Sequence, residues 1–447
     1  MAPDSQLKGV RRISDNRFSC VINAWRPWMD YRVDWDNSIF RGGDGCEIGL
    51  SYNTATGECE DPKVPSSDGG KGDPNLSCNA PPSFQGNPIN TANGNKFQHE
   101  VDYVGKNTAA GLVFERYYNG VDGVWLHGYS TRLVISPTQV VLIHADGRQS
   151  RYQLVTADRF DSKDETGSLV KQGDQWLYSA PGKTYVFNAS GQLERAGEGE
   201  EAVSFSYLGG KVIVKNQYGK ELTITEDWWH QPRSVSIDDK EFTFTYDLYN
   251  RLAQVARIVT NVPSQKTYHY EDPIHYLALT GITDERGVRY ATWAYDEQGR
   301  AISSEHAGGA EKVTLAYNAD GSTTVTNEYG KQATYRFQVI QGVKRIIAIE
   351  GEPSPNCPSS NSTFTYDERG LLKTRRDNKG NLTTYDYDAR GLEVSRTEAA
   401  GTPQARTVTT QWHPTLYRPL QVDEPGRVTR YRYDAQGRET GRTVTEH

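Results

Sequence analysis

From about residue 86 onward, apolar and polar residues alternate along the chain with a period of two. The segments 211–215, 221–225 and 241–246 show this alternation clearly. Successive side chains of a β-strand point to opposite faces of the sheet, so the pattern predicts strands with one buried face. Turn-forming sequences separate such segments, as at 144–148, where Asp-Gly is a strong short-range signal for a hairpin. The pattern therefore predicts an all-β, antiparallel fold built from hairpins.

The first 40 residues carry a different pattern, made by aromatic side chains. Trp25, Trp28, Tyr31 and Trp35 follow one another at steps of three, three and four residues. This spacing is typical of one face of a helix, and Pro27 is tolerated in a first turn. We therefore expect helix only at about 20–40. The aromatic face is a candidate docking site for a partner or a lipid surface; alternatively, it packs against the protein's own fold.

Cysteines gather in the same N-terminal region. Cys20, Cys46, Cys59 and Cys78 lie within the first 78 residues, and the fifth cysteine is Cys357. They lack the paired spacing of a structural zinc site. Four cysteines allow three pairings, and a small segment with little apolar content gains stability from cross-links. We expect disulfides Cys46–Cys59 and Cys20–Cys78, with Cys357 left over; four reduced cysteines are the alternative.

A short phrase recurs through the second half of the chain. A Tyr-Asp pair is followed by two variable residues and then, in most copies, by glycine; successive copies are one or two units of roughly 21 to 24 residues apart. In our interpretation the tyrosine ends a strand, the aspartate caps the turn and the glycine takes a positive φ. Each unit is then a hairpin that buries its face against its neighbours, so the units form a long ribbon.

The predicted turn residues are Tyr246, Asp247, Tyr295, Asp296, Gly299, Tyr366, Asp367, Gly370, Tyr387, Asp388, Gly391, Tyr433, Asp434 and Gly437. Asn250 stands in the glycine position once, and Tyr317-Asn318 begins a degenerate copy.

These repeats resemble those of the Rhs/YD-repeat family, which includes bacterial Rhs proteins, the C component of insecticidal Tc toxins and the extracellular part of teneurins. The resemblance covers about residues 86–447, with about six repeats. The segments 86–103, 112–119 and 124–130 are similar to the opening domain of the family. The resemblance implies that the repeats form part of a hollow β-shell, which can enclose a toxic C-terminal domain.

Three parts follow from this resemblance. Residues 1–85 form a small segment rich in tryptophan and cysteine together with a linker. Residues 86–235 form the opening β domain, and residues 236–447 form the ribbon of YD repeats.

Composition and motifs exclude several classes of function. Fifty basic and 57 acidic residues give a net charge of −7, so there is no strong basic field for nucleic acid. No apolar run is long enough to span a bilayer as a helix, and the N-terminus has no signal-peptide pattern. The nine histidines are scattered, and no phosphate-binding, dinucleotide or nucleophile motif occurs. We expect no enzyme activity, cofactor or metal; a glycosidase with paired carboxylates is the enzymatic alternative.

The main functional hypothesis is a structural scaffold of a secreted or cell-surface bacterial Rhs-type protein that serves toxin encapsulation, export or cell contact. The self-cleavage motif of toxin-releasing Rhs shells contains Asp-Pro followed by Xxx-Gly-Leu, and no Asp-Pro pair here continues in this way, so we expect either part of a longer product or a short relative. The alternative is a short YD-repeat module that binds glycans or a surface receptor through its aromatic residues. We also expect the C-terminal edge, around 427–445, to associate with another copy or with the rest of a shell.

Overall fold

The computed structural model of the 447-residue chain has two compact units, Met1–Asp68 and Gly69–His447, which are considered separately. In the first unit it describes the backbone of five strands. In the second unit it describes residues 70–447, apart from 74–79, 106–110, 137–138, 157, 163–166, 198–200, 260–261, 352–360, 435–436 and 447.

The first unit contains a three-stranded antiparallel sheet and one short strand pair. The sheet consists of β1 (Gln6–Arg12), β2 (Arg17–Arg26) and β3 (Tyr31–Phe40) in that order. The pair consists of β4 (Ser51–Asn53) and β5 (Glu58–Glu60).

The expected helix at 20–40 is wrong, because this segment forms β2 and β3. Trp25 lies opposite Arg32 in the register, and Trp35 lies opposite Ile22. Tyr31 begins β3, while Trp28 lies outside the described residues. The helical spacing counted aromatic residues alone and ran across Pro27. Between the aromatics, β2 and β3 contain β-branched residues, which favour strands because they pack well on a pleated surface.

The predicted disulfides stay predictions. Cys46 and Cys78 lie outside the described residues, and Cys20 and Cys59 lie in β2 and β5, whose side chains are not described.

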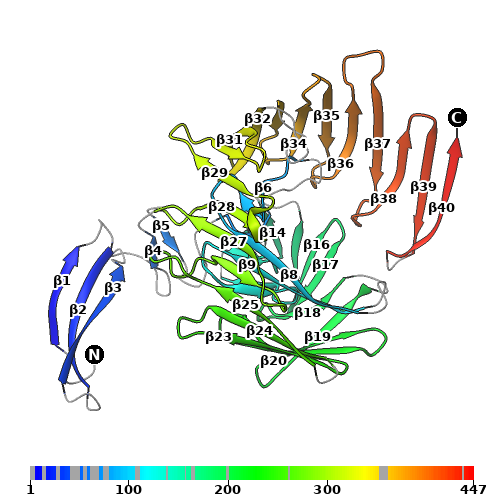
Figure 1. The fold of residues 1–447 in the computed structure, drawn as a ribbon. Helices are drawn as coiled ribbons and strands as arrows, with labels where there is room; N and C mark the ends of the chain where they lie inside the picture. The colour runs from blue at the N-terminus through cyan, green and yellow to red at the C-terminus, as the bar shows by residue number, and fades with distance from the viewer. Residues whose placement is uncertain are drawn as a thin grey trace. The chain divides into compact units, whose positions relative to one another are not determined.

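The second unit is dominated by one sheet of 30 strands, β11–β40, in which each strand pairs antiparallel with the next (Figure 1). The expected all-β fold is therefore confirmed. In the described part of the chain, helical backbone is limited to the short 3-10 turn η2 (Ala307–Gly309) and to Glu201, and no helix is long and apolar enough to cross a membrane.

The strands of the first half of the ribbon are β11 (Arg132–Ile135), β12 (Gln139–Ile143), β13 (Gln149–Thr156), β14 (Arg159–Ser162), β15 (Ser168–Gln172), β16 (Gln175–Ala180), β17 (Lys183–Phe187), β18 (Leu193–Ala196), β19 (Val203–Leu208), β20 (Lys211–Asn216), β21 (Glu221–Glu226), β22 (Pro232–Ile237), β23 (Lys240–Tyr246), β24 (Leu252–Val259) and β25 (Val262–His269). The second half consists of β26 (Gly281–Thr283), β27 (Arg289–Tyr295), β28 (Ala301–His306), β29 (Val313–Tyr317), β30 (Thr323–Thr326), β31 (Gln332–Ile340), β32 (Val343–Gly351), β33 (Ser362–Tyr366), β34 (Leu372–Arg376), β35 (Leu382–Tyr387), β36 (Glu393–Glu398), β37 (Arg406–Trp412), β38 (Pro419–Glu424), β39 (Arg427–Tyr433) and β40 (Glu439–Glu446).

A small inner sheet packs on one face of this ribbon. It consists of β8 (Phe97–Val104), β9 (Val113–Asn119) and β10 (Trp125–His127), preceded by the pair β6 (Phe84–Gln85) and β7 (Ile89–Asn90). Phe114, Tyr118 and Trp125 of the inner sheet share a buried core with ribbon residues such as Phe244 and Leu279. We call this face of the ribbon the core face. Alternation places apolar residues on it and leaves polar residues on the other face.

The ribbon has a second, smaller core where it begins. Strands β11–β18 bury Tyr152, Trp176, Tyr178 and Phe187 there. The sheet then continues without a break through β22, which contains residue 235. The proposed domain boundaries at 85 and 235 stay predictions.

Candidate functional site: the repeat turns and the core face

Each repeat turn is closed by its aspartate. In the turn after β35, Asp388 Oδ1 accepts hydrogen bonds from the backbone N–H groups of Arg390 and Leu392, both at 2.9 Å. Gly391 donates its N–H to the Asp388 carbonyl and has a φ of 78°, which a residue with a Cβ adopts only with strain. The same capping bonds occur at Asp247, Asp296 and Asp367, and Asp434 accepts from the N–H of Arg438.

The tyrosine of each repeat links its strand to the preceding strand. The hydroxyl of Tyr387, at the end of β35, donates to the carbonyl of Leu372 at the start of β34, at 2.7 Å. Burial raises the pKa of Tyr366 and Tyr433, which keeps these hydroxyls protonated as donors. Equivalent bonds run from Tyr246 to Pro232, Tyr295 to Leu279, Tyr317 to Ala301, Tyr366 to Ile346 and Tyr433 to Pro419.

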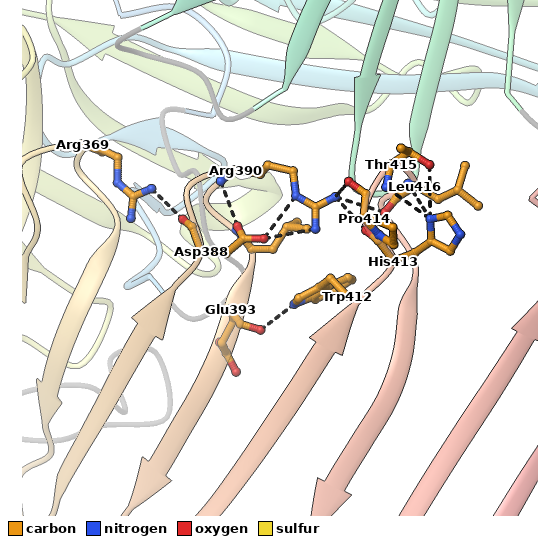
Figure 2. Close-up of polar contacts among 10 residues, drawn as sticks. Arg369, Asp388, Arg390, Glu393, Trp412, His413, Pro414, Thr415 and Leu416 are labelled. Atoms are coloured by element: carbon orange, nitrogen blue, oxygen red, sulfur yellow. Dashed lines mark hydrogen bonds and ion pairs between the residues drawn. The ribbon is translucent and has the colours of Figure 1, made fainter.

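Arginines connect successive turns along one edge of the ribbon (Figure 2). Arg369 Nη1 donates to the carbonyl of Asp388 in the next turn, at 2.9 Å, and Arg390 Nη1 donates to the carbonyl of His413 at 2.9 Å. Each arginine is also ion-paired with the aspartate of its own turn, as in the 3.1 Å contact between Arg390 and Asp388. The guanidinium fork is therefore held by one turn and fixes the position of the next.

His413 belongs to a repeat that the sequence interpretation missed. Trp412 Nε1 donates to the carbonyl of Glu393 at the start of the preceding strand, as the repeat tyrosines do (Figure 2). His413 Nδ1 accepts from the N–H groups of Thr415 and Leu416, as the repeat aspartates do. Trp-His thus replaces Tyr-Asp with groups of the same hydrogen-bonding capacity. The 46-residue step between Tyr387 and Tyr433, which fits two units, was the available signal.

A buried ion pair within the inner sheet also bonds to the core face. Arg116 Nε contacts Asp102 Oδ2 at 2.5 Å, and the Arg116 side chain is fully buried. Its guanidinium also donates to the hydroxyl of Tyr268 in β25 and lies 4.7 Å from the ring of Trp125. Burial disfavours the charge, but Asp102 and the other partners raise the pKa of Arg116 above its usual range. The inner sheet is therefore held by specific polar contacts as well as by apolar packing.

A second polar contact joins these two elements. His127 of β10 and His230, in the turn after β21, lie 3.0 and 2.8 Å from the two carboxylate oxygens of Glu226. Burial alone would raise the pKa of Glu226, but its hydrogen bonds with both histidines lower it to about 2. Burial lowers the pKa of His127, although Glu226 opposes this shift.

The core face changes character toward the C-terminus. The register places Arg375 opposite Phe364, and Arg396 opposite Tyr385, so these charges stand on the core face. With Glu398 and neighbouring residues they line a polar cavity of about 420 Å³. No metal-binding cluster of histidine, cysteine or carboxylate residues occurs in the part of the chain that the structure describes. The turns and the core face are therefore built from hairpin units that repeat the same contacts.

Family models match two parts of the chain. A domain of unknown function, DUF6531, matches residues 86–152, and the RHS Repeat matches residues 366–403. The second match contains Tyr366-Asp367 and Tyr387-Asp388, two of the turns described above.

Individual proteins match the chain only at low sequence identity. Double-stranded DNA deaminase toxin A of Burkholderia cenocepacia is 24% identical over 303 residues, which are 64% of this chain and 18% of that protein. A crystal structure of TcdB2-TccC3-TEV matches 77% of this chain and 20% of its own at 14% identity, with a TM-score of 0.37. A Tc holotoxin pore of Photorhabdus luminescens matches 96% of this chain and 26% of its own at 10% identity, with a TM-score of 0.30. The chain spans less than a third of each of these proteins.

Proposed function

The chain belongs to the Rhs/YD-repeat family, and we propose that it forms part of the wall of a bacterial protein shell that is secreted or displayed at the cell surface. In this role the ribbon encloses a toxic cargo for export or cell contact. In this role the repeat carboxylates are structural, since they bind backbone N–H groups and arginines in their own turns.

The observation that carries this proposal is the change along the core face. Near Phe244 this face is apolar and covered by the inner sheet, but at Arg375 and Arg396 it carries charges that line a cavity. A solid core requires apolar residues throughout. A wall around an aqueous compartment instead requires a stable starting core and then a polar inner surface, which is the sequence of features along this ribbon.

The links between repeats support the same role. Each repeat tyrosine bonds to the backbone of a neighbouring strand or loop, and Arg251, Arg369 and Arg390 bond to the backbone of another turn, so a further unit can be added without a new core. The name of the Burkholderia relative, a deaminase toxin, is consistent with a cargo-bearing protein of this kind.

The repeat tyrosines favour the scaffold over the glycan-binding alternative. Tyr366 and Tyr387 are partly buried, and their hydroxyls already donate to backbone carbonyls. A sugar-binding tyrosine needs an accessible ring face and a free hydroxyl.

The test is electron cryomicroscopy of the product of the complete reading frame that contains this chain. We expect the ribbon to continue into a closed wall, with the charged core face turned toward an enclosed segment. That segment should resist protease until the wall is opened by denaturant. An open, isolated ribbon, or an enclosed volume filled by the chain's own apolar side chains, would overturn the proposal.

A further inference from the structure

Three neighbouring turns on one edge of the ribbon have apolar tips. The turn between β21 and β22 carries Trp228 and Trp229, and the turn between β23 and β24 carries Leu248 and Tyr249. The loop between β25 and β26 carries Ile274 and Tyr276. Trp228 is 91% exposed and Leu248 is 101% exposed, and the other four side chains are more than half exposed. We call these six residues the tip patch.

The tip patch departs from the rest of the repeat turns. The equivalent tip positions are polar in the next turn along the edge, Glu297-Gln298, and in a later one, Glu368-Arg369. Turns on one edge recur every two strands, so three successive tips extend over about 20 Å. A contiguous exposed apolar surface of this kind marks an interaction site.

Cross-links hold the three turns as one rigid platform. Asn250 Nδ2 donates to Asp227 Oδ2 of the neighbouring turn at 3.4 Å, and Arg251 Nη1 donates to the carbonyl of Tyr276 at 2.6 Å. The rings of Tyr249 and Tyr276 lie 6.0 Å apart. The aromatic side chains are therefore presented on a fixed base.

One backbone donor in each tip is capped by an aspartate of its own turn. Asp227 Oδ1 accepts from the N–H of Trp229, Asp247 Oδ1 accepts from the N–H of Tyr249, and Asp272 Oδ1 accepts from the N–H of Ile274. A peptide segment enters an apolar medium at low cost only when its N–H groups already have partners. The capping bonds lower this cost at Trp229, Tyr249 and Ile274.

The charges behind the tips are paired with one another. Arg233 contacts Asp227 at 2.6 Å, and Arg251 forms an ion pair with Asp247 at 2.5 Å. These guanidinium groups therefore gain little from a nucleic acid or an anionic surface, and these carboxylates are already engaged rather than free for sugar hydroxyls. The surface that best fits the tip patch is therefore electrically neutral. It has an apolar layer for the tips and a polar layer next to it for tryptophan and tyrosine.

We propose that the tip patch inserts into the interfacial layer of a lipid bilayer with zwitterionic headgroups. Three convex tips need no matching pockets in a fluid bilayer, whereas a protein partner would need a hollow for each. Tryptophan and tyrosine favour the headgroup region, and leucine and isoleucine favour the acyl chains beneath it.

The experiment is flotation of the purified 447-residue protein with phosphatidylcholine vesicles. We expect the protein to float with the vesicles, and lipids brominated near the headgroup to quench tryptophan emission. Raising the salt concentration from about 0.1 to about 0.5 M should change the bound fraction little, because the contact is apolar.

The test variant replaces the tips with the polar pair that the chain uses at 297–298: Trp228→Glu, Trp229→Gln, Leu248→Glu and Tyr249→Gln. Asp227 and Asp247 keep their capping bonds, so the fold should remain, as checked by circular dichroism. Its partition onto vesicles should fall about tenfold or more. Glu297→Ala, in the adjacent polar turn, is the matched control and should bind as the wild type does.

Three results would overturn the proposal. The first is a wild-type protein that does not float, and the second is a test variant that floats as well as the wild type. The third is concentration-dependent self-association in sedimentation that the four substitutions abolish while vesicles bind nothing, which would assign the patch to a second copy of the chain.

Discussion

The hydroxyl of each repeat tyrosine stabilises the ribbon through one hydrogen bond. In Tyr387→Phe the ring stays in place, but the 2.7 Å bond to the Leu372 carbonyl is lost. We expect the free energy of unfolding to fall by about 0.5–1.5 kcal/mol, the usual net value of one such bond. Urea denaturation measures the change. Tyr329→Phe, at an exposed turn tip, is the control and should change stability much less; equal effects would show that the buried bond contributes nothing special.

A second prediction about single residues concerns the turn glycine. Gly391 has a φ of 78°, and Asn250 holds the same place in its own repeat with a φ of 60°. Gly391→Val should destabilise the protein by about 1–3 kcal/mol, because a β-branched residue is strained at positive φ. Gly391→Asn should cost clearly less, since asparagine tolerates this conformation. Thermal unfolding of both variants gives the comparison, and similar losses would contradict the turn geometry.

Single residues also show how far the sequence determines the site. The Tyr-Asp phrase predicts capped turns because its letters recur with a fixed chemistry. The Trp412-His413 turn does not match this phrase, although its indole N–H and imidazole Nδ1 supply the same donor and acceptor as tyrosine and aspartate. The bonds from Arg369 and Arg390 to the next turn could not be predicted, since they depend on which turns share an edge.

Between elements, the contact of β10 with β21 makes stability depend on pH. Burial lowers the pKa of His127 below the ordinary value of 6.5, so the unfolded chain takes up this proton at a higher pH than the folded protein. The stability that neutral His127 contributes is therefore complete above about pH 6.5 and is lost as the pH falls below it. Glu226, with its pKa lowered from 4.5 to about 2, adds a further loss below pH 4.5.

The variant His127→Gln tests this linkage. Urea denaturation at about pH 7.5 and about pH 5.5 should show a smaller loss of stability on acidification in the variant than in the wild type. The comparison uses the difference between the two pH values, so a lower overall stability of the variant does not affect it. Equal losses in both proteins would exclude His127 as the titrating group.

Elements also show where the sequence pattern failed. At 20–40 the aromatic spacing predicted a helix, but strand propensity and hairpin pairing between β2 and β3 prevailed. From residue 86 onward, the period-two alternation and the turn signals agreed with each other, and the predicted strands formed. The position of the inner sheet could not be predicted from the pattern. Alternation indicates that β8 and β9 are strands, but it does not indicate which face of the ribbon they cover.

At the scale of the whole molecule, β40 is the last strand of the 30-stranded sheet and pairs only with β39 on one side. The strands at this end, β36–β40, are largely polar. Among the described residues of these strands, Val444, which is 53% exposed, is the one large apolar side chain that stands out to solvent. We therefore expect association at this end to depend mainly on the backbone groups along the open edge of β40.

We predict that the 447-residue protein self-associates through this edge at high concentration, because a second strand would satisfy those backbone groups. Light scattering on the wild type should show a mass that rises with concentration. Val444→Lys places a charge on the edge strand and should shift the association to higher concentration, since lysine on an edge opposes strand addition. Leu208→Lys, at an exposed site in β19 within the sheet, is the matched control and should associate as the wild type does. A protein that stays monomeric throughout would mean that the edge of β40 is protected without a partner. Association abolished by the tip-patch substitutions, but not by Val444→Lys, would place the contact at the turns instead of at the last strand.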